Sequence, residues 1–139
     1  MLARVPYPYF RKDAEDWIDH VSGNVDAGQD LMFTLHRERL IGFMSLEGFD
    51  GVPEFGYWLA EPYWGKGFAT EAGAAVLAHA FGTRAIDRVV SAVFKDNPAS
   101  LNVQKKLGFK LSGNGSLWSS ARGEMVESFK TELTRRDFV

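Results

Sequence analysis

Apolar and polar residues follow two periods along the chain, one typical of strands and one typical of helices. Runs rich in apolar and β-branched residues predict strands over residues 31–36, 40–46, 54–60, 88–94, 109–111 and 124–133. Apolar residues at helical spacing predict helices over residues 13–21, 69–81 and 99–107, and Gly108 is placed to end the last of these. Residues 112–123 are rich in glycine and serine and are predicted to form a loop. This order of elements indicates an α+β (mixed α/β) fold with one sheet, without a regular βαβ repeat.

A glycine-containing turn joins the strand over 54–60 to the helix over 69–81 and reads WGKGFATEA over residues 64–72. Glycines at a turn that opens a helix expose backbone N–H groups at the positive end of the helix dipole, which favours binding of a phosphate or pyrophosphate. The Walker spacing is absent because Lys66 lies between Gly65 and Gly67. The dinucleotide fingerprint is incomplete because Thr70 stands at its third glycine.

Composition narrows the class of protein. The chain has 139 residues, which suits a single domain over 1–139, and its 45% hydrophobic and 24% charged residues are ordinary for a globular protein. A net charge of −2 argues against strong binding to nucleic acid or an anionic membrane. Absence of cysteine and wide separation of the three histidines predict no metal site. Without a recognisable leader or a long apolar run, we expect a cytoplasmic protein.

A second motif lies at the start of the helix over 99–107, where Asn97-Pro98-Ala99-Ser100 opens a segment that ends in Leu107-Gly108-Phe109. Together with the glycine turn, this motif resembles the GNAT superfamily of acyl-coenzyme A dependent N-acetyltransferases. The strand sequence Gly56-Tyr57-Trp58-Leu59 and the turn that follows are similar to the branch that contains the ribosomal-protein N-terminal acetyltransferases. The resemblance runs from about residue 6 to residue 133.

The resemblance implies a GNAT-like fold, with a central, mostly antiparallel, splayed mixed sheet flanked by helices, and it implies acetyl-CoA as the cofactor. The pantetheine arm would lie between the strands over 54–60 and 88–94, and the pyrophosphate would rest on the glycine turn. For Lys66, a solvent-facing position is at least as consistent with the sequence as a phosphate contact. The cofactor-binding residues expected from the resemblance are Leu59, Ala60, Trp64, Gly65, Lys66, Gly67, Phe68, Ala69, Thr70, Asn97 and Ser100.

The same resemblance implies two catalytic residues. Glu54 is the candidate general base, with Glu47 as a weaker second choice, and Ser100 is the candidate donor to the departing thiolate. Helix capping is an alternative role for Ser100, and a solvent-facing strand position is an alternative for Glu54. Tyr57 and Trp58 would either line the cleft or pack in the core. No serine–histidine–acid set is evident, so we expect direct transfer of the acetyl group to an amine without an acyl-enzyme.

The resemblance leaves the acceptor open. A protein N-terminal amine is one acceptor class, and a small amine or an aminoglycoside-like antibiotic is another, which the acidic residues Glu47, Asp50, Glu54 and Glu61 would favour. A third reading is an acyl-CoA binding module without turnover. Family members normally have a first strand and helix before the segment that resembles residues 6–21. This chain begins almost inside that segment, so the usual first strand and helix are expected to be missing. Without these elements, an edge strand and apolar surface would be exposed, and a homodimer that covers this surface is therefore expected.

Overall fold

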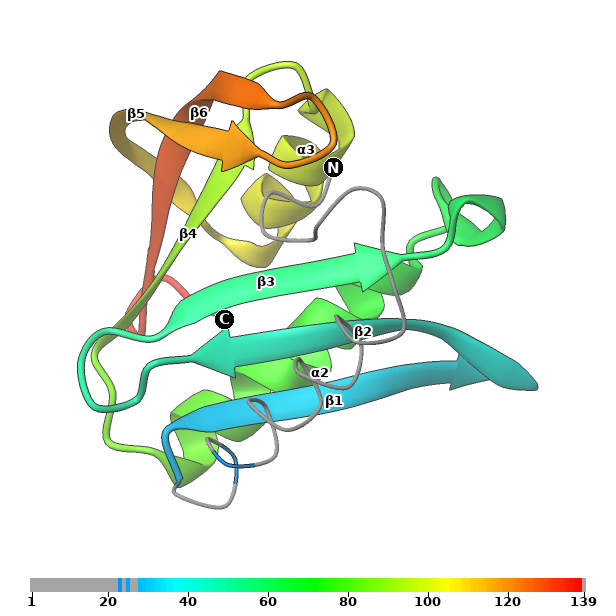
Figure 1. Ribbon diagram of the computed structural model, residues 1–139. Helices are drawn as coiled ribbons and strands as arrows, with labels where there is room; N and C mark the ends of the chain where they lie inside the picture. Colours follow the sequence, from blue (N-terminus) through cyan, green and yellow to red (C-terminus); the bar gives the residue numbers. More distant parts are fainter. Residues whose placement is uncertain (1–22, 24, 26–27, 139) are drawn as a thin grey trace.

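One six-stranded sheet organises the described residues, which are 23, 25 and 28–138 of the computed structural model (Figure 1). The predicted helix over 13–21 lies outside this part of the chain. The sheet has the order β1-β2-β3-β4-β6-β5 and, apart from the parallel β3–β4 pair, its neighbouring strands are antiparallel. The elements are β1 (Asp30–Arg37), β2 (Arg39–Glu47), β3 (Glu54–Leu59), the 3-10 helix η1 (Glu61–Tyr63), α2 (Phe68–Thr83), β4 (Arg88–Phe94), α3 (Pro98–Leu107), β5 (Lys110–Ser119) and β6 (Glu124–Thr134). In this part of the chain, no helix is both long and apolar enough to cross a membrane.

The sheet forks between β3 and β4. These strands pair in register at a single position, Glu54 opposite Val90, and the Val90 N–H donates to the Pro53 carbonyl at 3.0 Å. Beyond this point they run apart, so that β3 stays with β1 and β2 while β4 continues with β5 and β6 (Figure 1). The mostly antiparallel, splayed mixed sheet implied by the family resemblance is therefore confirmed.

Helix α2 covers one face of β1, β2 and β3 (Figure 1), and the main core lies between them. Phe55 of β3 and Leu77 of α2 are buried there, together with Leu107 of α3. A Cβ added at Gly73 of α2 would lie 2.7 Å from a methyl carbon of Leu107, so the glycine permits a close approach of α2 to α3. The core thus places the first turns of both helices at the carboxyl ends of the diverging strands.

The predicted loop over 112–123 is wrong for most of its length, because β5 extends through Ser119 and pairs with β6. Its glycines and serines are typical of a loop. In the structure, however, a Cβ at Gly115 would lie 2.9 Å from the Lys130 side chain of β6, so the glycine leaves room for this cross-strand side chain. Ser112, Asn114 and Ser116 are exposed, which removes the apolar alternation of a half-buried strand.

Candidate active site

The glycine turn gives α2 an uncapped N-terminus. Gly65 and Gly67 have φ angles of +69° and +82°, and Gly67 is the N-cap residue without a side-chain hydrogen bond to the helix. The space around both glycines would accept a Cβ, so it is the left-handed backbone that requires glycine here. The N–H groups of the first helical turn, from Phe68 to Thr70, have no acceptor within the helix and can bind an anion.

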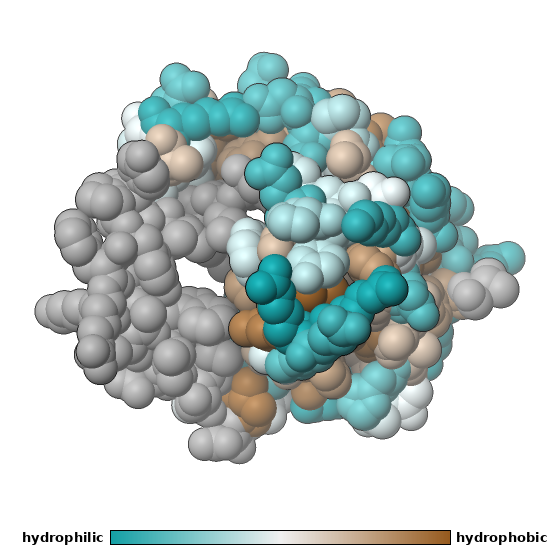
Figure 2. Space-filling model, turned by 90° about the vertical axis from the view of Figure 1, so that its right-hand side faces the viewer, coloured by the Kyte–Doolittle hydropathy of each residue, from teal (hydrophilic) through white to brown (hydrophobic). Residues whose placement is uncertain are grey.

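This turn forms one wall of a hollow of about 320 Å³, and α3 forms the other wall. Figure 2 shows the side of the molecule on which β3 ends and α2 begins, where hydrophilic residues surround smaller apolar areas. The cofactor residues expected from the sequence that line the hollow are Leu59, Gly65, Gly67, Phe68, Ala69 and Thr70.

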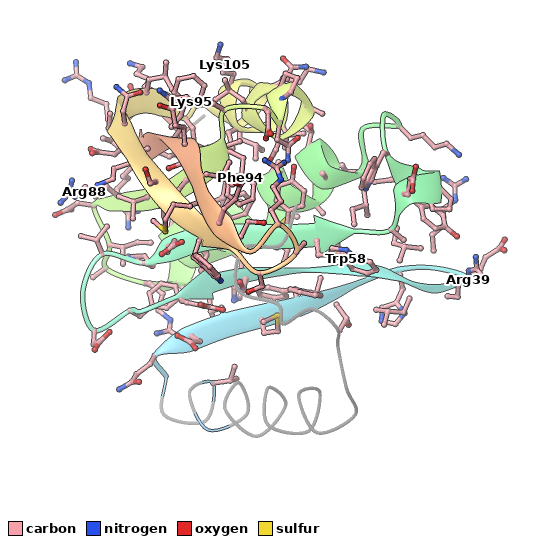
Figure 3. All side chains as sticks on the ribbon, turned by 45° about the horizontal axis from the view of Figure 1, so that its top comes forward. Arg39, Trp58, Arg88, Phe94, Lys95 and Lys105 are labelled. Atoms are coloured by element: carbon pink, nitrogen blue, oxygen red, sulfur yellow. The ribbon has the colours of Figure 1, made fainter. Side chains whose placement is uncertain are left out.

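Tyr63 and four residues of α3 also line the hollow and were missed by the sequence prediction. The α3 residues Ala99, Asn102, Val103 and Lys106 recur at helical spacing, a signal that identifies the face of the helix but not what it faces. Lys106 contributes a positive charge next to the glycine turn. Lys105, the preceding residue of α3, is exposed (Figure 3).

The edge of β3 that faces the fork carries backbone groups without a paired strand. Ala60 donates its N–H to the Ile41 carbonyl of β2 at 2.8 Å, so by strand alternation the backbone groups of Tyr57 and Leu59 point toward β4. The Leu59 carbonyl accepts a hydrogen bond from the Trp64 indole N–H at 2.5 Å. Within the described residues, the N–H of Leu59 and both backbone groups of Tyr57 therefore border the opening between the strands.

Five of the expected cofactor residues do not line the hollow: Ala60, Trp64, Lys66, Asn97 and Ser100. Both backbone groups of Ala60 are engaged, because its carbonyl also accepts from the Tyr63 N–H at 2.9 Å. The indole of Trp64 is bonded to β3, and Lys66 is exposed in the turn. Asn97 caps α3, where its side-chain oxygen accepts from the Ser100 N–H at 3.3 Å.

A pair of hydroxyl groups joins β3 to the first turn of α3. The oxygens of Tyr57 and Ser100 lie 3.2 Å apart, and both side chains are half-buried. Burial raises the pKa of Tyr57 above its ordinary value, although the bond to Ser100 opposes that shift. Tyr57 therefore keeps its proton at neutral pH and can donate it to Ser100, which leaves the Ser100 hydroxyl hydrogen free to point elsewhere.

Glu54 lies away from this hydroxyl pair. It is the exposed first residue of β3, and since it is three positions from Tyr57 its side chain is on the opposite face of the sheet. Glu47, the weaker candidate base, is its direct cross-strand partner on β2. Trp58 shares this face (Figure 3) and stacks on Phe43 with ring centroids 6.1 Å apart. Glu61 is in η1 beyond the other end of β3, so the four acidic residues do not form one cluster.

In the part of the chain that the structure describes, no group of three or more histidine, cysteine, aspartate or glutamate side chains could hold a metal ion. The hollow is bordered by an anion-binding helix end and an unpaired strand edge, and a hydroxyl pair joins the same strand to α3. These features define a site for a long phosphate-bearing ligand whose other end reaches into the sheet.

The chain belongs to the GNAT family of acetyltransferases, since the model of the acetyltransferase (GNAT) domain matches residues 1–110. Acetyl-CoA is the acetyl donor in this family, as expected from the sequence. The ribosomal-protein-serine acetyltransferase of Escherichia coli is 34% identical over 114 residues, which cover 77% of this chain and 64% of that protein. The uncharacterized N-acetyltransferase p20 of Bacillus licheniformis is 28% identical over 97 residues, covering 70% of this chain and 54% of that protein.

Solved structures agree on the fold. Mycobacterium smegmatis RimJ, determined in complex with CoA-disulfide, superposes with a TM-score of 0.81 at 21% identity, covering 90% of this chain and 62% of that chain. The present chain thus spans between half and two thirds of the length of the two curated relatives it resembles, 54% and 64%.

Proposed function

We propose that the chain moves an acetyl group from acetyl-CoA to a primary amine by direct attack of the amine, and that the acceptor is the N-terminal amine of a protein. One observation carries this proposal: a single hollow adjoins the uncapped end of α2, the unpaired edge of β3 and the first turns of α3. This combination suits a ligand that has both a pyrophosphate and a peptide-like arm.

In this proposal the N–H groups of residues 65–70 hold the pyrophosphate at the positive end of the α2 dipole. Lys106 adds charge near the phosphates, and the N–H of Leu59 pairs with an amide of the pantetheine arm. Ala60 contributes only van der Waals contact because its backbone groups are engaged. Acetyl-CoA supplies the activated acetyl thioester.

The chemistry needs a neutral amine and a stabilised thiolate. Glu54 takes a proton from the incoming ammonium, directly or through water, so that nitrogen can form its bond to the carbonyl carbon while the carbon–sulfur bond breaks. Ser100, held by Tyr57, donates a hydrogen bond to the sulfur as negative charge develops there. The second amine proton passes to solvent, and the thiolate of coenzyme A leaves or is protonated. The amine would approach from the face that carries Glu54 and Glu47.

The choice of a protein N-terminus as the acceptor depends on the name of one relative. The E. coli relative, 34% identical to this chain, is named as an acetyltransferase of a ribosomal protein, which favours a protein N-terminus over a small amine. Two adjacent carboxylates, Glu54 and Glu47, suit a cationic acceptor of either class.

The test is acetylation of a synthetic peptide with a free N-terminal serine, beside the same peptide with a blocked N-terminus and beside spermidine, each followed by mass spectrometry. We expect product on the free N-terminus and a loss of about a hundredfold in kcat/KM for Glu54→Gln, with coenzyme A affinity unchanged. Glu61→Gln, in η1, is the matched control and should keep full activity.

Each alternative has its own result in this assay. Acetylation of spermidine in preference to the peptide would show that the acceptor is a small amine and not a protein N-terminus. Coenzyme A binding without acetylation of any amine would indicate a binding module. Unchanged activity in Glu54→Gln would reject Glu54 as the base.

A further inference from the structure

A chain of buried side-chain hydrogen bonds crosses the point at which β3 and β4 part. The Ser91 hydroxyl of β4 donates to the Phe55 carbonyl of β3 at 2.7 Å. Gln104 of α3 donates its amide to the Ser91 oxygen at 2.9 Å, and the Thr131 hydroxyl of β6 donates to the Gln104 oxygen at 2.5 Å. Ser91, Gln104 and Thr131, here called the relay, are 7%, 2% and 1% exposed. Each of these three buried polar side chains therefore has the hydrogen-bond partners that burial requires.

The relay stands where the regular ladder ends. The last main-chain bond between the two strands runs from Val90 to Pro53, so the next β3 carbonyl toward the opening is that of Phe55. In a continuing parallel ladder, a β4 backbone N–H would reach that carbonyl and hold the strands together. Here a serine side chain takes that place, which satisfies the carbonyl while keeping the two backbones further apart.

The direction of every bond in the relay is determined. A serine hydroxyl has one hydrogen, and it is given to Phe55, so Ser91 can only accept from its other neighbour. The amide NH₂ of Gln104 supplies that donor, which leaves the Gln104 oxygen to accept from Thr131. The opposite orientation of the Gln104 amide would claim the Ser91 hydrogen and leave the Phe55 carbonyl without it. An apolar residue at position 104 would no longer direct the Ser91 hydrogen toward the Phe55 carbonyl.

The relay also fixes α3 relative to the opening. Gln104 and Ser100 are four residues apart and so lie on one face of the helix. Gln104 ties that face to β4 and β6, while Ser100 meets Tyr57 of β3 one turn nearer the start of α3. The two contacts hold one helix against both arms of the fork.

We propose that Ser91, Gln104 and Thr131 are positioning residues that set the width of the β3–β4 opening for the pantetheine arm. This inference rests on the proposed function, because it assumes that the arm of coenzyme A lies there. The relay acts on the arm and not on the phosphates, which bind at the separate end of α2. A role in stability alone would affect both ends of the ligand equally.

The experiment measures by calorimetry the affinity of the full chain for coenzyme A and for 3′-phospho-ADP, the part of coenzyme A that lacks pantetheine. Ser91→Ala, Gln104→Met and Thr131→Val are compared with Ser128→Ala. Ser128 is a buried serine of β6 whose side chain lies on the opposite sheet face from Thr131. We expect coenzyme A affinity to fall about tenfold in Ser91→Ala and Gln104→Met, with 3′-phospho-ADP affinity unchanged. Thr131→Val is nearly isosteric and lies at the end of the relay away from β3, so it should have a smaller effect in the same direction.

Equal weakening of both ligands, or no change in either, would overturn the inference. So would a Ser128→Ala variant that behaves like Ser91→Ala. If Ser91→Ala does not fold, the Thr131→Val variant still distinguishes the two ligands. A parent chain that binds 3′-phospho-ADP and coenzyme A equally well overturns the inference and leaves the phosphate site intact, whereas one that binds neither contradicts the proposed function as well.

Discussion

The hydroxyls of Ser100 and Tyr57 share one hydrogen bond, and in the proposed mechanism Tyr57 donates to Ser100 so that the Ser100 hydrogen is left to point at the departing sulfur. Ser100 is recognisable from the sequence because it follows Asn97 in a helix-opening motif. Tyr57 is 43 positions away, and its apolar neighbours on β3 make it look like a core aromatic residue. The pairing depends on the fork, which no local pattern reveals.

A double-mutant cycle at this pair tests the assignment. We expect Ser100→Ala to lower kcat by about tenfold to a hundredfold, because a hydrogen bond to developing charge is lost. Tyr57→Phe should lower kcat less, and it should have no further effect in the Ser100→Ala background, since Tyr57 acts through Ser100. Steady-state kinetics with saturating acetyl-CoA provide the measurement. Additive losses would show that Tyr57 has a separate role.

At the scale of the elements, periodicity predicted most of the sheet and both described helices. The apolar runs of β1, β2, β3 and β4 arise because these strands contribute side chains to the core. The pattern fails at β5, where the strand is largely exposed and glycines accommodate Lys130. The cofactor loop was predictable because positive φ angles at Gly65 and Gly67 require glycine. The residues of α3 that line the hollow were not predictable, because their position depends on how α2 and α3 approach one another.

That approach is tested by Gly73→Val in α2. The new side chain would meet Leu107 of α3, because even a Cβ comes within 2.7 Å of it. We expect the free energy of unfolding to fall by about 1–3 kcal/mol and coenzyme A to bind more weakly, since α3 is pushed away from the glycine turn. Chemical denaturation and calorimetry measure the two effects. Gly82→Ala, at an open position near the end of α2, is the control and should be neutral or slightly stabilising. A Gly73→Val variant as stable as the parent would contradict the close packing of the helices.

At the scale of the whole molecule, the fork brings together parts of the chain that the sequence keeps apart. The end of β3, the start of α2 and the start of α3 meet because both helices follow strands that diverge from one paired position. Local sequence patterns predicted the end of β3 and the starts of both helices, whereas the divergence of β3 and β4 was expected only from the family resemblance. The side chains proposed to hold the fork open, Ser91, Gln104 and Thr131, had no sequence signal. Gln104 and Thr131 have charged neighbours in the sequence and resemble exposed positions, although both are buried. The homodimer expected from the sequence stays a prediction.

The central claim is that acetyl-CoA binds between the α2 turn and the fork. Calorimetric titration of the chain with acetyl-CoA, beside Gly67→Trp and the control Gly51→Trp, tests it most directly. Gly67 must keep a φ of +82° at the helix start, whereas Gly51 lies in the exposed turn between β2 and β3. The account predicts saturable binding to the parent and to Gly51→Trp, and a loss of at least about tenfold in affinity for Gly67→Trp. Binding that is equal in all three proteins, or absent from the folded parent, would contradict it.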